Sequence, residues 1–306
     1  MVKPIIQVEN FRKIYGDVVA VADISFSLQQ GEIFGLLGPN GAGKTTTLEC
    51  LEGLRIPTSG RLLVAGIDPS SEPGKLHNLI GVQLQSGALP ESITPEEAIK
   101  FFCAYHDVVP CFDLLTRLGL GEKRKSQFFS LSAGQQRRLM LALAIAHRPQ
   151  VVFLDEPTAG LDVATRVELH NLIRELKNRG TTVILATHDM AEAEELSDRV
   201  AILLRGKVVT IGSPLEITAT GAGLTKISVR TEQGCLLPDG SSNLPAVTQY
   251  LVKDEYSIYF STSIGATLAA IIEGLAAHGD SLIDLRVERP TLEDRFLELT
   301  IEGEDL

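Results

Sequence analysis

The stretch GPNGAGKTT at residues 38–46 constrains the fold more than any other part of the chain. It fits the pattern G-x-x-x-x-G-K-[ST] and lies between an apolar run at 33–37, interpreted as a buried strand, and a helical segment at 41–54. In that context the glycines let backbone N–H groups close around phosphate oxygens. Lys44 can reach the β- and γ-phosphates of a nucleotide, and the Thr45 hydroxyl can bind Mg²⁺. An ordinary glycine turn is the alternative, and the strand–turn–helix context favours a phosphate-binding loop.

Two carboxylates follow a second apolar run, VVFLD at 151–155. Asp155 ends this predicted strand and is placed to hold Mg²⁺. Glu156 comes next, at the carboxyl end of the strand, where open α/β sheets bind ligands, and a carboxylate there can orient and polarise water. Such a pair is often only a solvated strand end, but the phosphate-binding loop favours a catalytic interpretation. His188 follows the strand-like TVILAT at 182–187, and its position alone fits a surface residue as well as a partner of the γ-phosphate.

Strand-like and helical patterns alternate along most of the chain, which predicts a mostly parallel α/β sheet. A helical stretch at 94–147 interrupts this alternation, beginning with Thr94 as a helix cap and Pro95 at the first helical position. A linker is expected at 212–223, followed by a small α+β unit. The further predicted strands are 24–28, 80–84, a hairpin at 201–212 turning near Arg205, 225–231, 246–252, 255–261 and 282–288; the further helices are 163–179, 266–277 and one from Thr291.

Composition narrows the class of protein. The formal net charge of −11 argues against broad contacts with nucleic-acid phosphates. Cys50, Cys103, Cys111 and Cys235 have no metal-type spacing and are expected to be reduced thiols of a cytosolic protein. The N-terminus lacks the apolar core of a signal peptide, and no apolar run approaches 18 residues. We therefore expect a soluble chain whose membrane role, if it has one, comes through a partner.

A second helix start suited to an anion lies at SLSAGQ, residues 130–135. Ser132 and Gly134 lead into an apolar-periodic helix, although the loop at 38–46 already surrounds the phosphates of its own nucleotide. The simplest arrangement that gives both helix starts a role is one in which this helix start contacts the γ-phosphate bound to another copy of the chain. Two chains placed head-to-tail around a two-fold axis would bury two nucleotides between them.

These motifs together resemble the ATP-binding cassette (ABC) ATPases, over about residues 4–220. LSAGQ at 131–135 is similar to the family's signature motif, residues 38–45 to its Walker A motif and VVFLDEP to its Walker B motif, while AGLD at 159–162 resembles the D-loop. The resemblance implies that His188 is the switch histidine and that Gln85 is the Q-loop glutamine, which touches the metal and senses the membrane partner; Gln83 is the alternative. Ala133 departs from the common signature, which has glycine there, whereas Gly134 is retained.

The resemblance implies an α/β fold of the P-loop NTPase kind: an ABC ATPase core with an antiparallel β subdomain and an α-helical insertion, plus a small C-terminal α+β domain. The expected domains are 1–220, with the helical subdomain at about 90–148, and 221–306. Glu156, His188, Lys44 and Gln85 are the implied catalytic residues, and Thr45, Gln85 and Asp155 the implied metal ligands. The implied nucleotide-binding residues are Tyr15, Gly38, Pro39, Asn40, Gly41, Ala42, Gly43, Lys44, Thr45, Thr46, Ser132, Ala133, Gly134 and Gln135.

The closing segment RPTLEDRFLELT at 289–300 resembles that of drug- and antibiotic-exporter ATPases, which act with ABC-2 type permeases. The resemblance thus implies an ATP- and Mg²⁺-dependent ATPase that works as a homodimer at the cytoplasmic face of the membrane. It would drive an integral membrane permease, and no nucleic acid is expected as a partner. The alternative is a soluble ABC ATPase acting on nucleic acid or ribosomes; a nucleotide-dependent regulator with little turnover is disfavoured because Glu156 is intact.

Overall fold

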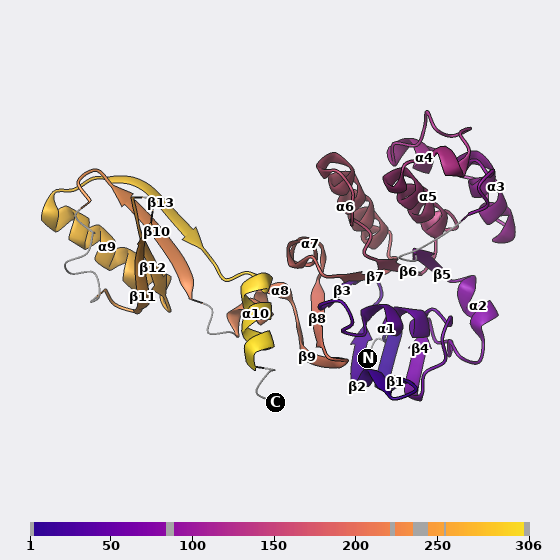
Figure 1. Cartoon of the computed structure of the whole chain (residues 1–306), viewed down its shortest axis with the longest axis horizontal. Coiled ribbons are helices and arrows are strands. Elements are labelled where there is room, and N and C mark those ends of the chain that lie inside the picture. The colour runs from indigo at the N-terminus through magenta and orange to yellow at the C-terminus, as the bar shows by residue number, and fades with distance from the viewer. Residues whose placement is uncertain (1–2, 84–88, 221–223, 235–243, 254, 303–306) are drawn as a thin grey trace. The chain divides into compact units, whose positions relative to one another are not determined.

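The computed structural model describes residues 3–83, 89–220, 224–234, 244–253 and 255–302 (Figure 1). The chain divides into two compact units, Met1–Pro214 and Leu215–Leu306. The division falls a few residues before the predicted boundary at 220, and each unit is described here by itself.

A six-stranded sheet forms the centre of the first unit, in the order β5-β6-β7-β3-β8-β9. The first five strands are parallel and β9 is antiparallel to β8, so the predicted α/β class is confirmed. The strands are β3 (Ile33–Leu37), β5 (Ile80–Gln83), β6 (Val151–Asp155), β7 (Thr182–Thr187), β8 (Arg199–Leu204) and β9 (Lys207–Gly212). The hairpin between β8 and β9 turns at Arg205 and Gly206, both with positive φ, as a two-residue turn of the favoured hand requires.

Both faces of this sheet are covered, which is why β3, β6 and β7 are buried along their whole length. Successive side chains of β6 join two different hydrophobic cores, with Val152 and Leu154 in one and Val151 and Phe153 in the other. The flanking helices are α1 (Lys44–Leu51), α2 (Pro73–His77), α6 (Val163–Asn178) and α7 (Met190–Leu196). Helix α1 belongs to the second of these cores and α6 to the first, so they lie on opposite faces.

A three-stranded antiparallel sheet, β2-β1-β4, packs into the same core as α1. Its strands are β1 (Ile6–Tyr15), β2 (Val18–Leu28) and β4 (Ser59–Val64). On the other face, residues 94–147 form a helical segment rather than one helix. It consists of α3 (Pro95–Tyr105), α4 (Asp113–Arg117), the 3₁₀ turn η1 (Phe128–Ser130) and α5 (Ala133–Ile145). Thr94 caps α3 in a capping box with Glu97, which fixes where this segment begins.

The second unit contains a four-stranded antiparallel sheet in the order β11-β12-β10-β13. Its small core gathers Ile227, Val229 and Tyr259 from the sheet against Ile271 and Leu275 of α9. Helix α8 (Pro214–Ala219) begins at the boundary between the units; the other elements are β10 (Thr225–Thr231), β11 (Val247–Lys253), β12 (Tyr256–Ser261), α9 (Ile264–His278), β13 (Leu282–Glu288) and α10 (Leu292–Glu302). Among the described residues, no helix is both long and apolar enough to cross a bilayer.

Candidate nucleotide site

The loop between β3 and α1 approaches its neighbours too closely for most side chains. A Cβ atom on Gly38 would lie 2.3 Å from the carbonyl oxygen of Leu203, and one on Gly43 would lie 2.6 Å from that of Ala20. Gly43 also has a φ of 102°, a conformation that only glycine adopts without strain. These two positions therefore need glycine for the loop to fold back over the start of α1 as it does.

Lys44, the first residue of α1, turns its side chain back under the loop. Its Nζ donates to the carbonyl oxygens of Gly38 at 2.7 Å and Pro39 at 3.3 Å, and the side chain is 7% exposed. Burial lowers the pKa of the Lys44 ammonium, while the carboxylates of Glu156 and Asp155 oppose that shift. The ammonium is thus held by weak carbonyl partners in a desolvated position, where an anionic ligand would be bound strongly.

Thr45 and Asp155 meet across the start of α1 and the end of β6. The Thr45 hydroxyl donates to Asp155 Oδ2 at 2.8 Å, and Asp155 Oδ1 is buried without a hydrogen-bond partner among the described residues. Burial raises the pKa of the Asp155 carboxyl, and the hydrogen bond from Thr45 works against that change. A hydroxyl beside a carboxylate with a buried free oxygen suits a hard cation such as Mg²⁺, which prefers oxygen ligands.

Glu156 lies directly after β6 and is held in an uncommon backbone conformation, with φ 50°. Its N–H donates to the carbonyl oxygen of Ala186 at 2.9 Å, which continues the strand pairing one residue further. Its carboxylate accepts from Nδ1 of His188 at 2.8 Å and lies 3.9 Å from the ammonium of Lys44. The Glu156 side chain is 10% exposed and that of His188 is 60% exposed, so a nearly buried carboxylate is paired with a histidine that faces solvent.

The structure brings Lys44, Thr45, Asp155, Glu156 and His188 together at the carboxyl ends of the parallel strands. The helix start at Ser132 is separate from them. Ser132 and Gln135 form a reciprocal capping box at the exposed beginning of α5. Within the described part of the chain, no hydrogen bond joins residues 132–135 to the loop at 38–46.

Of two further predicted site residues, Tyr15 is among the residues that the structure describes and Gln85 is not. Tyr15 ends β1 and is 37% exposed, with Lys13 Nζ 4.8 Å and the Arg55 guanidinium 5.4 Å from its ring centroid. Gln85 lies outside the described residues. Its alternative, Gln83, ends β5 and is 1% exposed, with both side-chain amide atoms lacking a hydrogen-bond partner among the described residues. The choice between the two glutamines as the metal contact therefore stays a prediction.

Sequence reasoning missed Glu52, which caps the carboxyl end of α1 and is 2% exposed. Burial raises the pKa of its carboxyl to about 8, and the nearby Asp155 and Glu49 add to the shift. The signal was a glutamate inside the apolar run LECLEGL, at a helical position facing the core.

Proteins with similar sequences are named as ATP-binding proteins, which agrees with the phosphate-binding loop described above. The chain matches the family model described as ABC transporter over residues 21–159. It is 32% identical over 309 aligned positions to the linearmycin resistance ATP-binding protein LnrL of Bacillus subtilis, covering 96% of this chain and 98% of that protein. It is 33% identical to the daunorubicin resistance ATP-binding protein DrrA3 of Streptomyces coeruleorubidus, with 98% and 96% covered. The Nod factor export ATP-binding protein I of Burkholderia orbicola is 36% identical, with 96% of both chains covered.

Among solved structures, cbiO1 from Clostridium perfringens, part of the ABC transporter complex cbiONQ, matches with a TM-score of 0.62 and 32% identity. The match covers 71% of this chain and 91% of that one. A structure described as the ATP binding subunit of an ABC transporter matches with a TM-score of 0.66 and 26% identity, over 70% and 91% of the two chains.

Proposed function

This chain belongs to the ABC transporter family of ATP-binding proteins, and we propose that it is the ATP-hydrolysing subunit of an exporter that drives a separately encoded membrane permease. The observation that carries the proposal is the hydrogen bond of Thr45 to Asp155 next to the Glu156–His188 pair, whose carboxylate lies 3.9 Å from the ammonium of Lys44 in the loop at 38–46. Phosphoryl transfer to water needs a loop that binds phosphate, oxygen ligands for a cation and a carboxylate next to them.

Lys44 and the backbone N–H groups of the loop hold the β- and γ-phosphates in this proposal. The Lys44 ammonium exchanges its carbonyl partners for phosphate oxygens, which bear full charge and bind it more strongly. Thr45 and Asp155 would hold Mg²⁺, together with Gln85, and the bound ion would neutralise charge on the phosphates. The unpartnered Asp155 Oδ1 and the adjacent Thr45 hydroxyl are the features of this chain that fit the ion.

Glu156 orients and polarises the water that attacks the γ-phosphate. Its strained backbone, pinned by the hydrogen bond from its N–H to Ala186, fixes the direction of the carboxylate. His188 positions that carboxylate through its Nδ1 and leaves its other ring nitrogen for the γ-phosphate. Tyr15 offers an exposed ring on which the adenine base can stack.

The separation of Ser132 from the loop at 38–46 supports a two-chain site. Gly134 lies in the first turn of α5, where free N–H groups and the helix dipole attract an anion. In a head-to-tail homodimer, residues 132–135 of each chain complete the nucleotide site of the other, so ATP joins the two chains and hydrolysis releases them.

Export is favoured over a role on nucleic acid or ribosomes by the full-length similarity to proteins named for antibiotic resistance and for Nod factor export. This similarity includes the second unit, which lies beyond the matched family region. The proposed place of work is the cytoplasmic face of the membrane, where the chain is held by its permease.

Copurification tests this function. We expect the affinity-tagged chain to purify from detergent-solubilised membranes with a multispanning membrane protein, and the complex to hydrolyse ATP in liposomes. The same preparation with Glu156→Gln should keep the membrane protein and lose turnover. Recovery of the chain with ribosomes or nucleic acid, and no membrane protein, would instead support the alternative.

A further inference from the structure

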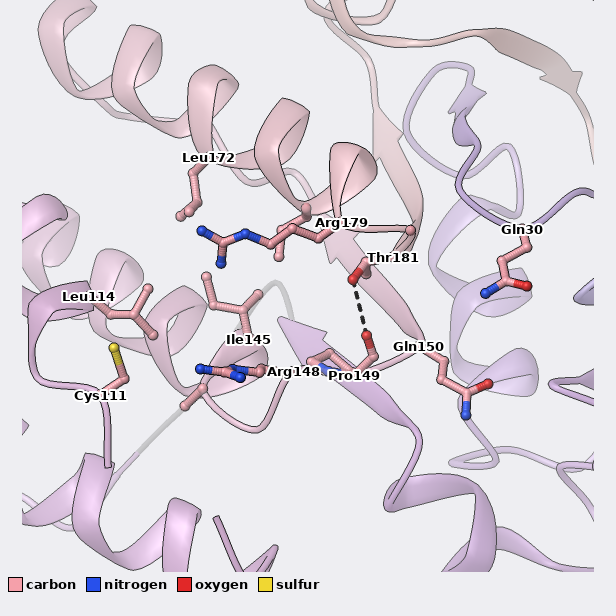
Figure 2. A pocket seen from close by; sticks show the side chains of 13 residues that line it. Gln30, Cys111, Leu114, Ile145, Arg148, Pro149, Gln150, Leu172, Arg179 and Thr181 are labelled. Atoms are coloured by element: carbon pink, nitrogen blue, oxygen red, sulfur yellow. Dashed lines mark hydrogen bonds between the residues drawn. The ribbon is translucent and has the colours of Figure 1, made fainter. Parts of the chain in front are cut away.

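A cavity lies at the amino-terminal ends of β6 and β7 in the central sheet (Figure 2). It has a volume of about 600 Å³ and is bordered by Gln150 and Thr181, which directly precede β6 and β7. The phosphate loop and Asp155 lie at the other ends of these parallel strands. The cavity, called the basal cavity below, is therefore a place that the nucleotide being hydrolysed does not occupy.

The charge around the basal cavity is opposite in sign to that of the chain. The chain carries a formal net charge of −11, yet the residues lining this cavity include Arg148 and Arg179 and no acidic side chain. Figure 2 shows both guanidinium groups pointing into the same space, one on either side of Ile145. Two cations without a carboxylate among the lining residues favour an anionic occupant.

Neither guanidinium has a strong partner of its own. Arg148 makes no ion pair or side-chain hydrogen bond within the described residues. Arg179 reaches Glu175 at 3.5 Å, but that carboxylate already accepts two hydrogen bonds from Arg117, at 3.0 and 2.8 Å. Both groups therefore keep donors free for an anion, and guanidinium suits carboxylate and phosphate oxygens particularly well.

The backbone of Arg148, which lines the cavity, has an energetically unfavourable conformation. Its φ is 57°, in the left-handed region, and the next residue is Pro149, which restricts the conformation of the residue before it. The strained turn leads the chain from the end of α5 into β6. This conformation fixes the direction in which the Arg148 side chain leaves the backbone.

Part of the cavity lining is apolar. Leu172 and Leu176 of α6 and Leu114 of α4 form this part, together with Ile145. The volume lies in the range of ordinary small-molecule sites, about 300–1,000 Å³. A bare inorganic ion would use only the guanidinium groups, whereas an apolar molecule would leave these two groups without an anion.

We propose that the basal cavity binds a small amphipathic organic anion, with its carboxylate or phosphate group at Arg148 and Arg179 and its apolar body against Leu114, Leu172 and Leu176. The proposal is independent of ATP hydrolysis, since the two sites lie at opposite ends of the strands.

Cys111 provides a local readout because it is exposed and lines the same cavity, whereas Cys50 and Cys103 are buried. The full chain, free of nucleotide, is treated with iodoacetamide, and alkylation of the Cys111 peptide is followed by mass spectrometry. Decanoate and decyl phosphate serve as amphipathic anions, decanol as the neutral analogue and inorganic phosphate as the headgroup alone. We expect both amphipathic anions to protect Cys111, and decanol and inorganic phosphate to need at least about tenfold higher concentrations, because charged hydrogen bonds and apolar contacts each contribute.

Substitution separates the two guanidinium groups from general charge effects. Arg148→Gln and Arg179→Gln should each raise the decanoate concentration for half-protection about tenfold, as loss of a charged hydrogen bond predicts. Arg61→Gln removes an exposed arginine on β4 and should change nothing. Arg148→Lys should recover part of the protection, since the charge returns without the planar donors. Equal protection by decanol, equal protection by inorganic phosphate, or unchanged affinity in both Gln variants would each overturn the proposal.

Discussion

At the scale of single residues, the position of Glu156 depends on backbone and side chain together. Its N–H is fixed by Ala186, its carboxylate by His188, and the Lys44 ammonium lies 3.9 Å away. An amide of the same shape leaves the backbone hydrogen bond unchanged and can still accept from His188, but it loses the negative charge and with it the ion pair with Lys44. Substitution by glutamine therefore isolates the chemical role of Glu156 from its structural one.

We predict that Glu156→Gln lowers the ATPase rate by about 10²–10⁴-fold, the usual cost of losing a general base. The affinity for ATP should stay close to that of the wild type, because the phosphate loop is untouched. Steady-state phosphate release and calorimetric ATP titration measure the two quantities. Glu72→Gln, at an exposed position on the surface, is the matched control and should leave both unchanged. Wild-type turnover in Glu156→Gln would remove this residue from the mechanism.

Glu52 gives a pH-dependent prediction. The pKa of its carboxyl is raised from 4.5 to about 8 in the folded chain, so folding takes up a proton between these values. The stability that the protonated group contributes is complete below pH 4.5 and is lost as pH rises toward 8. Glu52→Gln keeps the shape and removes the titration. Its free energy of unfolding relative to wild type should rise by up to about 3 kcal/mol between pH 4.5 and 7.

Urea unfolding of both chains at several pH values measures this difference. The control is again Glu72→Gln, whose curve should run parallel to that of the wild type because this variant keeps the Glu52 carboxyl. If the curve of Glu52→Gln were parallel as well, the carboxyl of Glu52 would be ionised in the folded chain and the shift would be absent.

At the scale of elements, the strands of the central sheet were predictable because they are buried on both faces. IFGLL, VVFLD and TVILAT are continuous apolar runs, and β3, β6 and β7 coincide with them. Helix α7 was missed because it is short, and MAEAEEL carries few apolar side chains; its start is fixed by the Asp189 cap. Strand β4 was missed because SGRLLV buries only two side chains fully, and its pairing with β1 is a long-range contact.

The site was partly predictable for the same reason. Asp155, Glu156 and His188 each lie at the end of a predicted strand or directly after it. Because parallel strands end at the same edge of a sheet, these positions in the sequence are enough to predict that the three side chains lie together. The positive φ of Glu156 could not be inferred, because it depends on the hydrogen bond from its N–H to Ala186 in another segment. The break of residues 94–147 into separate helices comes from turns around Asp107 and Gly119, each with positive φ.

The start of α5 supplies the prediction at this scale. Ser132→Arg replaces the capping residue with a bulky cation at the exposed helix start, and loss of such a cap costs about 1 kcal/mol. We expect ATP binding by dilute monomer to be nearly intact and hydrolysis to be abolished, since the helix start serves the nucleotide of the other chain. Calorimetry and phosphate release test both parts.

Ser130→Arg, two residues earlier and outside α5, is the matched control for the added charge and should keep most of the activity. Loss of ATP affinity in monomeric Ser132→Arg would place the helix start in the same chain's site and would rule out the two-chain arrangement.

At the scale of the whole molecule, the two compact units have different kinds of core. The first unit buries two large clusters on the two faces of a parallel sheet, whereas the second relies on a small cluster between α9 and an antiparallel sheet. The phosphate loop and the carboxylate of Asp155, which accepts from its Thr45, belong to the first unit. We therefore propose that two such first units must meet for ATP to be hydrolysed.

The mass of Glu156→Gln in solution, with and without ATP and Mg²⁺, shows whether ATP joins two chains. One chain has a mass of 33.1 kDa. Light scattering coupled to size-exclusion chromatography should give the mass of one chain without nucleotide and of two chains with ATP. Addition of Lys44→Ala to the same chain should abolish the dimer, because the phosphates are no longer held. A Glu156→Gln chain that binds ATP with unchanged affinity and remains a monomer at every concentration would contradict the account.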